Sequence, residues 1–308
     1  MAQARANEIQ AMFDDGRVYR IEPLAADAEA DIAIGRIIAP PGTKFRALKI
    51  GRSDTLRRGD TIAVLGAPLG GSLVPAVGVL GGTRYVADDE VMNYVLNSRA
   101  DWCLLQVDAN MSSGSSGGPI VNANGDVVGV SVMVQTAGTL GVGNLNYGVA
   151  IDQAYPIIRE LLNKGTVTRA AIGMTIVLID RLANERELHS SGINYLPPKS
   201  DYLTGLLVTY TVPNKPAELA GVKEGDVILE INGRKMTRKG DYFAALGPVY
   251  EPGKELVCKV WRPNISTSNL LTTQGRGGQI ITTTIKPIIR DAPTLGGSRR
   301  RSGSGWNR

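Results

Sequence analysis

Short apolar runs separated by turn residues fill the first 150 residues, and this pattern constrains the fold more than any other feature. Helical spacing is nearly absent before residue 152. Strands at such regular spacing are typical of β-barrels and sandwiches, so this part is predicted to be all-β. The expected strands are residues 9–13, 18–21, 32–38, 47–50, 61–65, 77–80, 94–96, 102–107, 119–121 and 127–133. The first two runs flank Asp15 and Gly16, an Asp-Gly step that predicts a hairpin.

Residues 114–119 read Gly-Ser-Ser-Gly-Gly-Pro and lie directly before the hairpin predicted for residues 119–133. The simplest interpretation is a flexible turn, because Gly and Ser dominate turns. The position at the mouth of a hairpin favours a nucleophile loop instead. Gly114 would let the N–H groups of Gly114 and Ser116 point at one spot and stabilise a developing oxyanion. Ser116 is therefore the predicted nucleophile.

This loop resembles the nucleophile loop of chymotrypsin-fold serine proteases, and its surroundings resemble the HtrA/Deg family. Residues 31–34 are similar to the family's aspartate strand, residues 59–70 to its barrel-crossing segment, and residues 145–151 to the strand that closes its second barrel. The resemblance extends over roughly residues 6–290. It implies a mainly β protein with a chymotrypsin-like double β-barrel, whose first barrel is incomplete, followed by a PDZ domain.

The resemblance also implies roles for single residues. Asp31 would orient the catalytic histidine and stabilise its imidazolium, although a lone Asp before a strand is more often a solvated acid or a turn cap. Ser116 and Gly114 would form the nucleophile and oxyanion hole. The residues that would line the specificity pocket are Asn110, Met111, Val130, Ser131 and Val132. Since none is acidic, the pocket would favour small or medium apolar side chains over Lys or Arg.

The histidine base is missing from its expected place. A serine hydroxyl needs a base, and in this family the histidine precedes the aspartate and the serine. The chain has one histidine, His189, which lies far beyond Ser116. On the family frame, the catalytic histidine falls at or just before Met1. Two interpretations stay open: an N-terminally truncated protease, favoured because Asp31 and the loop persist, or a pseudoprotease that binds polypeptide C-termini as a PDZ adaptor. Either way, we expect reduced stability and negligible peptide cleavage.

Residues 152–163 are the clearest helix, with Asp152 as N-cap, Pro156 in the first turn and Gly165 as the stop signal. This helix is expected to end a protease domain of residues 1–165. Residues 166–290 are expected to form a PDZ domain with inserts at 180–202 and 262–279 and a last strand at 280–285. Residues 291–308 are rich in Gly, Ser and Arg and are predicted to be a disordered basic tail.

The PDZ expectation depends on the order of elements after residue 171. A strand at 172–176 and another at 205–212 precede a helix that begins at Pro216 and a strand that ends at Asn232 and Gly233. The resemblance implies that the N–H groups of Ile172, Gly173 and Met174 hold a C-terminal carboxylate, while the next strand pairs with the peptide. The alternative is a domain that serves only in packing.

Composition narrows the remaining classes. With 43% hydrophobic residues, 20% charged residues and a net charge of +5, the chain resembles soluble globular proteins. No apolar run approaches the roughly 20 residues of a membrane span. Basic residues concentrate in the tail rather than on a predicted face, which argues against nucleic acid. Cys103 and Cys258 fall in different expected domains and are interpreted as buried thiols.

No cofactor or metal is expected, because the sequence has neither a phosphate-binding loop before a helix nor a Cys/His cluster. The implied partners are polypeptide substrates, chiefly unfolded or damaged proteins, and protein C-termini. The family resemblance also implies homo-oligomers built from trimers. The first eight residues lack the apolar core of a signal peptide. The compartment stays open, and a mitochondrion or plastid fits if a targeting segment was lost.

Overall fold

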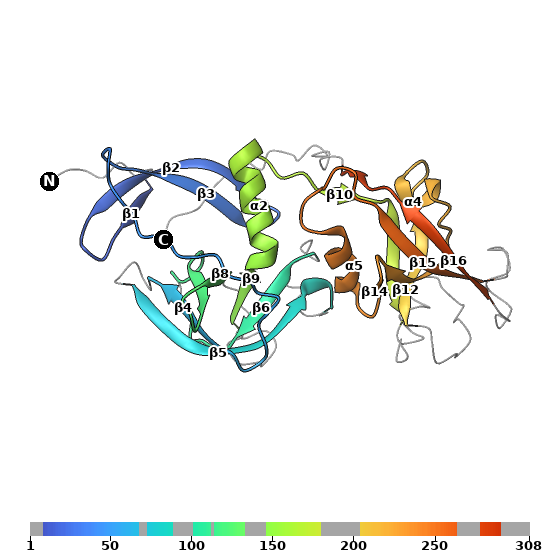
Figure 1. Cartoon of the computed structure of the whole chain (residues 1–308), viewed down its shortest axis with the longest axis horizontal. Helices are drawn as coiled ribbons and strands as arrows, with labels where there is room; N and C mark the ends of the chain where they lie inside the picture. The colour runs from blue at the N-terminus through green and yellow to red at the C-terminus, as the bar shows by residue number, and fades with distance from the viewer. Residues whose placement is uncertain are drawn as a thin grey trace, which may run out of the picture.

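The computed structural model describes residues 9–67, 73–88, 101–111, 114–132, 146–179, 204–263 and 278–290. These residues form a three-stranded sheet, a closed six-stranded barrel and a separate C-terminal sheet (Figure 1). The expected mainly β class is confirmed. Within the described ranges, no helix is both long and apolar enough to cross a membrane.

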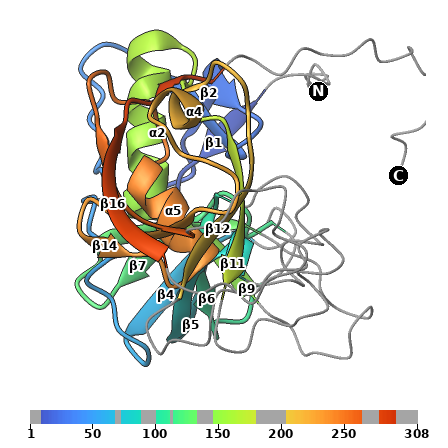
Figure 2. The same cartoon turned by 90° about the vertical axis from the view of Figure 1, so that its right-hand side faces the viewer.

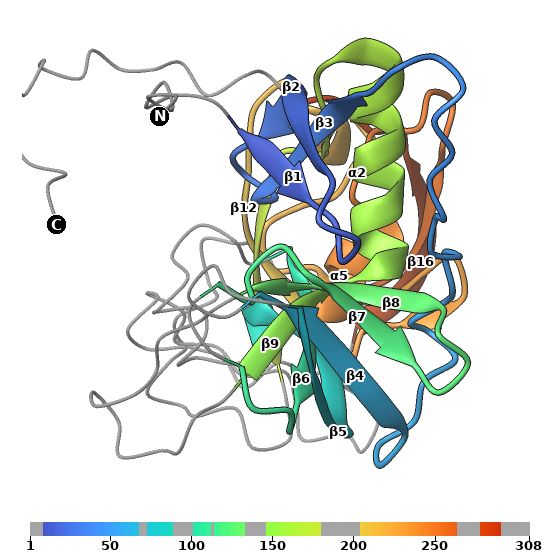
Figure 3. The same cartoon turned by 90° about the vertical axis from the view of Figure 1, so that its left-hand side faces the viewer.

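The N-terminal sheet has the order β1-β2-β3, with β1 at Gln10–Met12, β2 at Val18–Asp27 and β3 at Ile32–Ile38. The predicted hairpin at Asp15 and Gly16 is confirmed: Gly16 has φ 82°, and Asp15 accepts bonds from the Arg17 N–H at 3.1 Å and Nε at 2.6 Å. The described part of this sheet does not close into a barrel. Figure 3 shows it stacked beside the closed barrel.

The closed barrel has the strand order β4-β5-β6-β9-β8-β7. Its strands are β4 (Thr61–Gly66), β5 (Val74–Tyr85), β6 (Cys103–Val107), β7 (Pro119–Asn122), β8 (Val127–Val132) and β9 (Asn146–Ala150). A short 3-10 turn, η2 (Val86–Asp88), follows β5. The strand expected at residues 47–50 is wrong, because Ile50 forms only an isolated bridge to Val127. A closed barrel has no free edge for another strand. The strand expected at residues 94–96 lies outside the described residues.

Helix α2 spans Ile151–Lys164 and packs between the N-terminal sheet and the barrel. Its inner side chains share one hydrophobic cluster with both sheets: Ile151, Ala154, Ile157 and Leu161 from the helix, Ile32 from β3, and Leu104, Tyr147 and Val149 from the barrel. Gly165, with φ 75°, ends the helix as expected.

The expected N-cap at Asp152 is wrong. Strand β9 runs directly into the helix, so the cap position falls on Ala150, which makes no side-chain cap bond. Asp152 lies in the first turn, and Pro156 falls deeper inside the helix than expected. The Asp152 carboxylate instead accepts bonds from the Ser53 N–H at 2.7 Å and the Asp54 N–H at 2.8 Å. It therefore fastens the segment before β4 to the helix.

The C-terminal sheet has the order β11-β12-β13-β15-β16, with β14 (Arg234–Lys235) paired to β13. Its strands are β11 (Met174–Ile179), β12 (Gly205–Thr211), β13 (Val227–Ile231), β15 (Leu256–Pro263) and β16 (Gly278–Ile285). The helices are α4 (Pro216–Leu219) and α5 (Lys239–Leu246). β10 (Ala170–Ala171) and β17 (Ile288–Ile289) form a separate pair. Figure 2 shows the molecule from the side on which this sheet lies.

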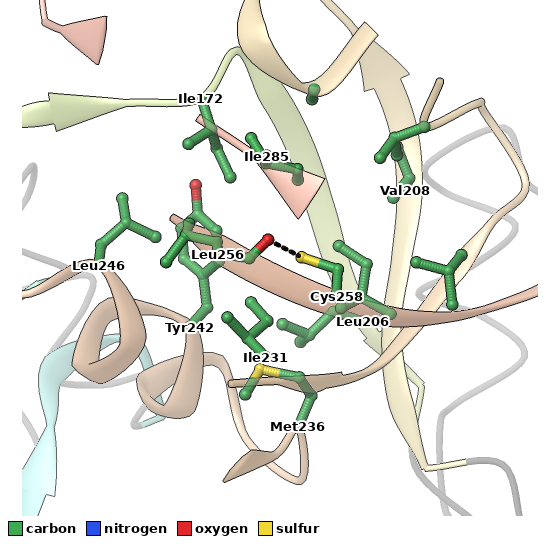
Figure 4. Packing of buried hydrophobic residues seen from close by; sticks show 14 residues of the cluster. Ile172, Leu206, Val208, Ile231, Met236, Tyr242, Leu246, Leu256, Cys258 and Ile285 are labelled. Carbon is green, nitrogen blue, oxygen red and sulfur yellow. Dashed lines mark hydrogen bonds between the residues drawn. The ribbon is translucent and has the colours of Figure 1, made fainter. Parts of the chain in front are cut away.

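The core of this sheet includes Ile172, Tyr242 and Leu246, which pack on buried strand residues (Figure 4). Helix α5 was not expected from the sequence. The loop expected over residues 262–279 is partly wrong, because the β15–β16 ladder continues to the pair Pro263 and Gly278. Residues 264–277 of that loop and the whole insert at 180–202 lie outside the described residues.

Both cysteines are free thiols. Cys258 is buried and donates weakly to the Leu256 carbonyl at 3.5 Å. Cys103 is only partly buried, so the expectation of two buried thiols is correct for Cys258 alone. Burial raises the pKa of Cys103 to about 11 and that of Cys258 to about 12, which keeps both protonated and weakly nucleophilic near neutral pH.

Candidate functional site

The predicted nucleophile loop lies between the end of β4 and strand β8. Gly114 and Gly117 have φ values of 98° and 84°, which glycine adopts without strain. The Gly118 N–H donates to the Ser115 carbonyl at 3.1 Å and closes a tight turn. Within this turn Ser115 is buried while Ser116 is exposed. The loop therefore presents one of its two serines to solvent.

Glycines allow the loop to pack directly on β4. A Cβ on Gly118 would lie 2.1 Å from the Leu65 carbonyl oxygen, and a Cβ on Gly66 would lie 2.7 Å from Ser115 Oγ. Neither position has room for a side chain. The Ala67 N–H adds a long bond of 3.4 Å to the Gly114 carbonyl. Contact with the end of β4 thus determines how closely the loop packs on the barrel.

Ser131 on β8 holds the loop from the other side. Its N–H donates to the Gly118 carbonyl at 2.9 Å, and its carbonyl accepts from the Gly117 N–H at 2.8 Å. Its hydroxyl donates to the carbonyls of Ser115 and Gly118, the latter at 3.0 Å. The Ser131 side chain is fully buried and supports the loop. Its place at a specificity pocket stays a prediction.

The Gly114 N–H is directed to no acceptor among the residues that the structure describes. Gly114 is exposed, so water can occupy this N–H until a substrate carbonyl replaces it. This is the state required of an oxyanion-hole donor before substrate arrives. The oxyanion role of Gly114 and Ser116 stays a prediction.

Asp31 ends the turn between β2 and β3. It is exposed and has φ 55°, a left-handed conformation that Asp tolerates better than most residues. Ile32, directly after it, packs in the same hydrophobic cluster as Val130 and Val132, which flank Ser131. The residue after Asp31 and the two neighbours of Ser131 thus pack in the same hydrophobic cluster. The orienting role of Asp31 stays a prediction.

The described residues include no histidine, since His189 lies outside them. They also contain no group of three or more His, Cys, Asp or Glu side chains that could hold a metal ion. The described part of the site therefore supplies a hydroxyl and backbone N–H groups, but no imidazole base.

The other predicted pocket residues differ in exposure. Asn110 is exposed, whereas Met111 is 8% exposed and packs in the barrel core. Val130 and Val132 are half-buried. Their assignment to a specificity pocket stays a prediction.

The predicted carboxylate loop lies between β10 and β11. Ile172 is buried, Gly173 has φ 71°, and Met174 begins β11, which is an edge strand of the described sheet. The Gly173 N–H has no acceptor within the described ranges. An edge strand beside a free N–H is the arrangement that adds a peptide as a further strand. The peptide-binding role of Ile172, Gly173 and Met174 stays a prediction.

Sequence reasoning missed two features near these loops. The first is α5, whose Tyr242 and Leu246 are four residues apart and precede Gly247, a spacing and stop signal that would have identified a helix. The second is the support by Ser131, which has no local sequence signal because its partners precede it by more than ten residues.

Comparison with known proteins identifies both parts of the chain. Residues 2–130 match the family model of the trypsin-like peptidase domain, and residues 207–253 match that of the PDZ domain. A probable periplasmic serine endoprotease DegP-like of Marinomonas sp. is 30% identical over 275 residues, which cover 84% of this chain and 53% of that protein. The chain belongs to the HtrA/Deg family.

Other relatives extend this result. Serine protease HTRA1B of Danio rerio is 29% identical over 249 residues, which cover 79% of this chain and 48% of that protein. The solved structure of the HtrA-type protease AlgW with decapeptide has a TM-score of 0.64 at 22% identity, covering 94% of this chain and 78% of the other. That likeness supports the fold, a chymotrypsin-like domain followed by a PDZ domain. The chain spans about half the length of the curated relatives it matches.

Proposed function

We propose that this HtrA/Deg chain carries the nucleophilic site of a serine endopeptidase that cleaves unfolded or damaged polypeptides. The observation that carries the proposal is the loop of residues 114–118. It exposes Ser116 while Ser131 and the end of β4 hold the backbone on either side. Family membership and the family names of its relatives, serine endoproteases, support the same activity.

In the proposed reaction, a histidine base takes the Ser116 proton as Oγ attacks the substrate carbonyl carbon. The N–H groups of Gly114 and Ser116 stabilise the resulting oxyanion. The C–N bond then breaks, and the base returns the proton to the leaving amine. Water hydrolyses the acyl-enzyme by the same steps and releases Ser116. Asp31 orients the base and stabilises its charged form.

The described residues contain no histidine that could act as the base, and this favours a second candidate function. A chain of this sequence without a positioned histidine would act as a pseudoprotease or PDZ adaptor that binds polypeptide C-termini. Both proposals share the same fold and differ in the chemistry of Ser116. The 308-residue chain alone is expected to hydrolyse peptides at a negligible rate.

Ser116 is expected to react with a fluorophosphonate probe when free imidazole serves as the base, which the described residues do not supply. Imidazole in solution can act as the general base for a hydroxyl that is already positioned. Labelling of the chain should therefore rise with imidazole concentration, as measured by intact mass and peptide mapping. Ser116→Ala should show none of this increase.

The matched control is Ser115→Ala, which removes the neighbouring buried hydroxyl and leaves Ser116 in place. It should retain the imidazole-dependent labelling. Labelling that survives Ser116→Ala would end the protease assignment. A complete lack of imidazole-dependent labelling, with C-terminal peptide binding intact, would support the adaptor function.

The carboxylate loop is proposed to bind polypeptide C-termini, and Gly173→Ala is expected to weaken this binding by about tenfold or more, equivalent to 1.4 kcal/mol. A Cβ on Gly173 would lie 2.3 Å from Lys215 Cβ, and the φ of 71° disfavours any other residue. The loop would shift and its N–H groups would lose their common direction. A fluorescent decapeptide with an apolar C-terminal residue, titrated by anisotropy, measures the change.

Gly221→Ala is the control for this experiment, because Gly221 has a similar φ of 78° with no atom near its Cβ position. It should leave the affinity within about twofold. The same peptide with an amidated C-terminus should bind weakly. Equal binding of the amidated and free peptides would contradict carboxylate recognition.

A further inference from the structure

A partly buried ion cluster joins the turn before Asp31 to both chain ends of the PDZ region. Arg169 lies between α2 and β10, and its Nη2 is 2.5 Å from Asp27 Oδ2, while its Nη1 is 3.5 Å from Glu29 Oε2. The side chains of Arg169 and Asp27 are each only 10% exposed. A guanidinium buried to this degree requires nearby carboxylates.

Arg290 adds a second link from the other end of the PDZ region, directly after β17. Its N–H donates to the Arg169 carbonyl at 2.7 Å. Its Nη2 donates to both oxygens of the Glu29 carboxylate, at 2.6 and 2.5 Å. The chain therefore enters and leaves the PDZ region at one place, and both ends bind the same acidic turn.

This turn leads into Asp31. Asp27 is the last residue of β2, and its carboxylate accepts from the Glu29 N–H at 3.1 Å. On the barrel side, the indole Nε1 of Trp102 donates to the Glu29 carbonyl at 3.0 Å. Ile32 then begins β3. The backbone before Asp31 is thus held by the barrel through Trp102 and by the PDZ region through the two arginines.

The cluster is better suited to fixing position than to adding stability. Replacing buried ion pairs by apolar groups is often neutral for stability, whereas their directional bonds can specify one arrangement. Within the described residues, Arg169 Nε is buried without a hydrogen-bond partner, so the cluster is not optimised for energy. Arg169 and Arg290 both bind carboxylates of the short segment from Asp27 to Glu29, so the ion pairs of the cluster hold that segment in place.

We propose that Arg169 is a positioning residue that sets the β2–β3 turn, and through it Asp31, against the PDZ region. The acid of the site then takes its working position only when both PDZ chain ends are docked at this turn. The importance of Asp31 rests on the proposed function, whereas the setting of the turn by Arg169 does not.

The test is Arg169→Met, which removes the cation and keeps an unbranched apolar stem. The Trp102 indole N–H reports the turn directly, because it donates to Glu29. In ¹⁵N NMR spectra of the whole chain, its exchange with solvent should accelerate by about tenfold or more, and its resonance should shift. Trp102→Phe identifies this signal among the three tryptophans. The amides of Gly117 and Gly118 should keep their protection, because they bond to Ser131 and Ser115.

Arg36→Met is the matched control, since Arg36 pairs with Glu22 on the same hairpin at 3.8 Å but is 64% exposed. It should leave the Trp102 signal unchanged. If Arg169→Met does not fold, Arg290→Met removes only the outer arm and should still shift the Trp102 signal. An unchanged Trp102 signal in every folded variant would overturn the proposal.

A second readout separates this inference from the proposed function. Imidazole-dependent labelling of Ser116 should fall by about tenfold in Arg169→Met and stay unchanged in Arg36→Met, because only the first displaces Asp31. If the native chain is not labelled at all, the protease proposal fails, and the Trp102 signal still decides the role of Arg169. Normal labelling in Arg169→Met with a shifted Trp102 signal would overturn the link to Asp31.

Discussion

Gly118→Ala is expected to abolish imidazole-dependent labelling of Ser116 and to destabilise the barrel by about 3 kcal/mol or more. The new Cβ would lie 2.1 Å from the Leu65 carbonyl oxygen and 3.0 Å from the Ser115 carbonyl oxygen. Both contacts are with backbone, so neither atom can rotate away. Leu65 is held in the β4–β5 ladder opposite Pro75, and the loop must therefore move instead.

A displacement of this kind affects Ser116 more than it affects the fold. Moving a reacting group by about 1 Å can cost about 100-fold in rate. The labelling rate and the free energy of unfolding, from urea denaturation, should be measured on the same preparation. Labelling at the native rate would show that the contact between the loop and β4 does not position Ser116.

Gly125→Ala provides the comparison. Gly125 lies in the turn between β7 and β8 with φ 79°, and its Cβ position has no atom nearby. The substitution carries only the strain of a left-handed backbone, about 1–2 kcal/mol. It should leave labelling of Ser116 unchanged. The two variants together separate crowding of the loop from the general effect of replacing a glycine.

Asp226→Ala is expected to lower the free energy of unfolding of the PDZ region by about 3 kcal/mol. Asp226 is 1% exposed and receives Arg262 Nε at 2.8 Å and Nη2 at 2.7 Å in a bidentate pair. The Lys223 N–H also donates to it at 2.8 Å. Removing the carboxylate leaves these donors unsatisfied. Because Arg262 is 21% exposed and also binds the Gly221 carbonyl, the loss should lie at the lower end of the range for buried pairs.

The measurement is urea denaturation followed by far-UV circular dichroism and by tryptophan fluorescence, to which Trp261, opposite Val227 at the start of β13, contributes. Glu230→Ala is the control, because Glu230 pairs with a 44% exposed Lys259 at 3.6 Å. That surface pair should contribute less than about 1 kcal/mol. If the two variants lost the same free energy of unfolding, the burial of Asp226 would contribute nothing to stability.

Local sequence signals determined a large part of this structure. The hairpin at Asp15 and Gly16, the strands of the barrel and the end of α2 at Gly165 each follow from residues that are adjacent or nearly so. The loop of residues 114–118 is equally local, because its glycines define its conformation. Turn chemistry and side-chain periodicity act over a few residues, and they indicated an all-β first part, whereas the family came from the resemblance of several segments to HtrA/Deg proteases.

Expectations that depended on distant contacts were less reliable. Residues 47–50 have strand composition but meet a barrel that is already closed. Asp152 has the composition of a cap, but Ser53 binds its carboxylate. Ser131 supports the nucleophile loop, a role that the sequence did not predict. In each case, a partner far away in the sequence decided the outcome.

The sequence by itself determined where the glycine-rich loop turns, because glycines at defined positions allow left-handed backbone without help from the rest of the chain. Its resemblance to HtrA/Deg proteases pointed to the family. Only the tertiary structure decided what holds that loop and the turn before Asp31. Arg169, Arg290 and Trp102 come from three separate parts of the chain, and they meet at Asp27 and Glu29 because the folded backbone brings them together.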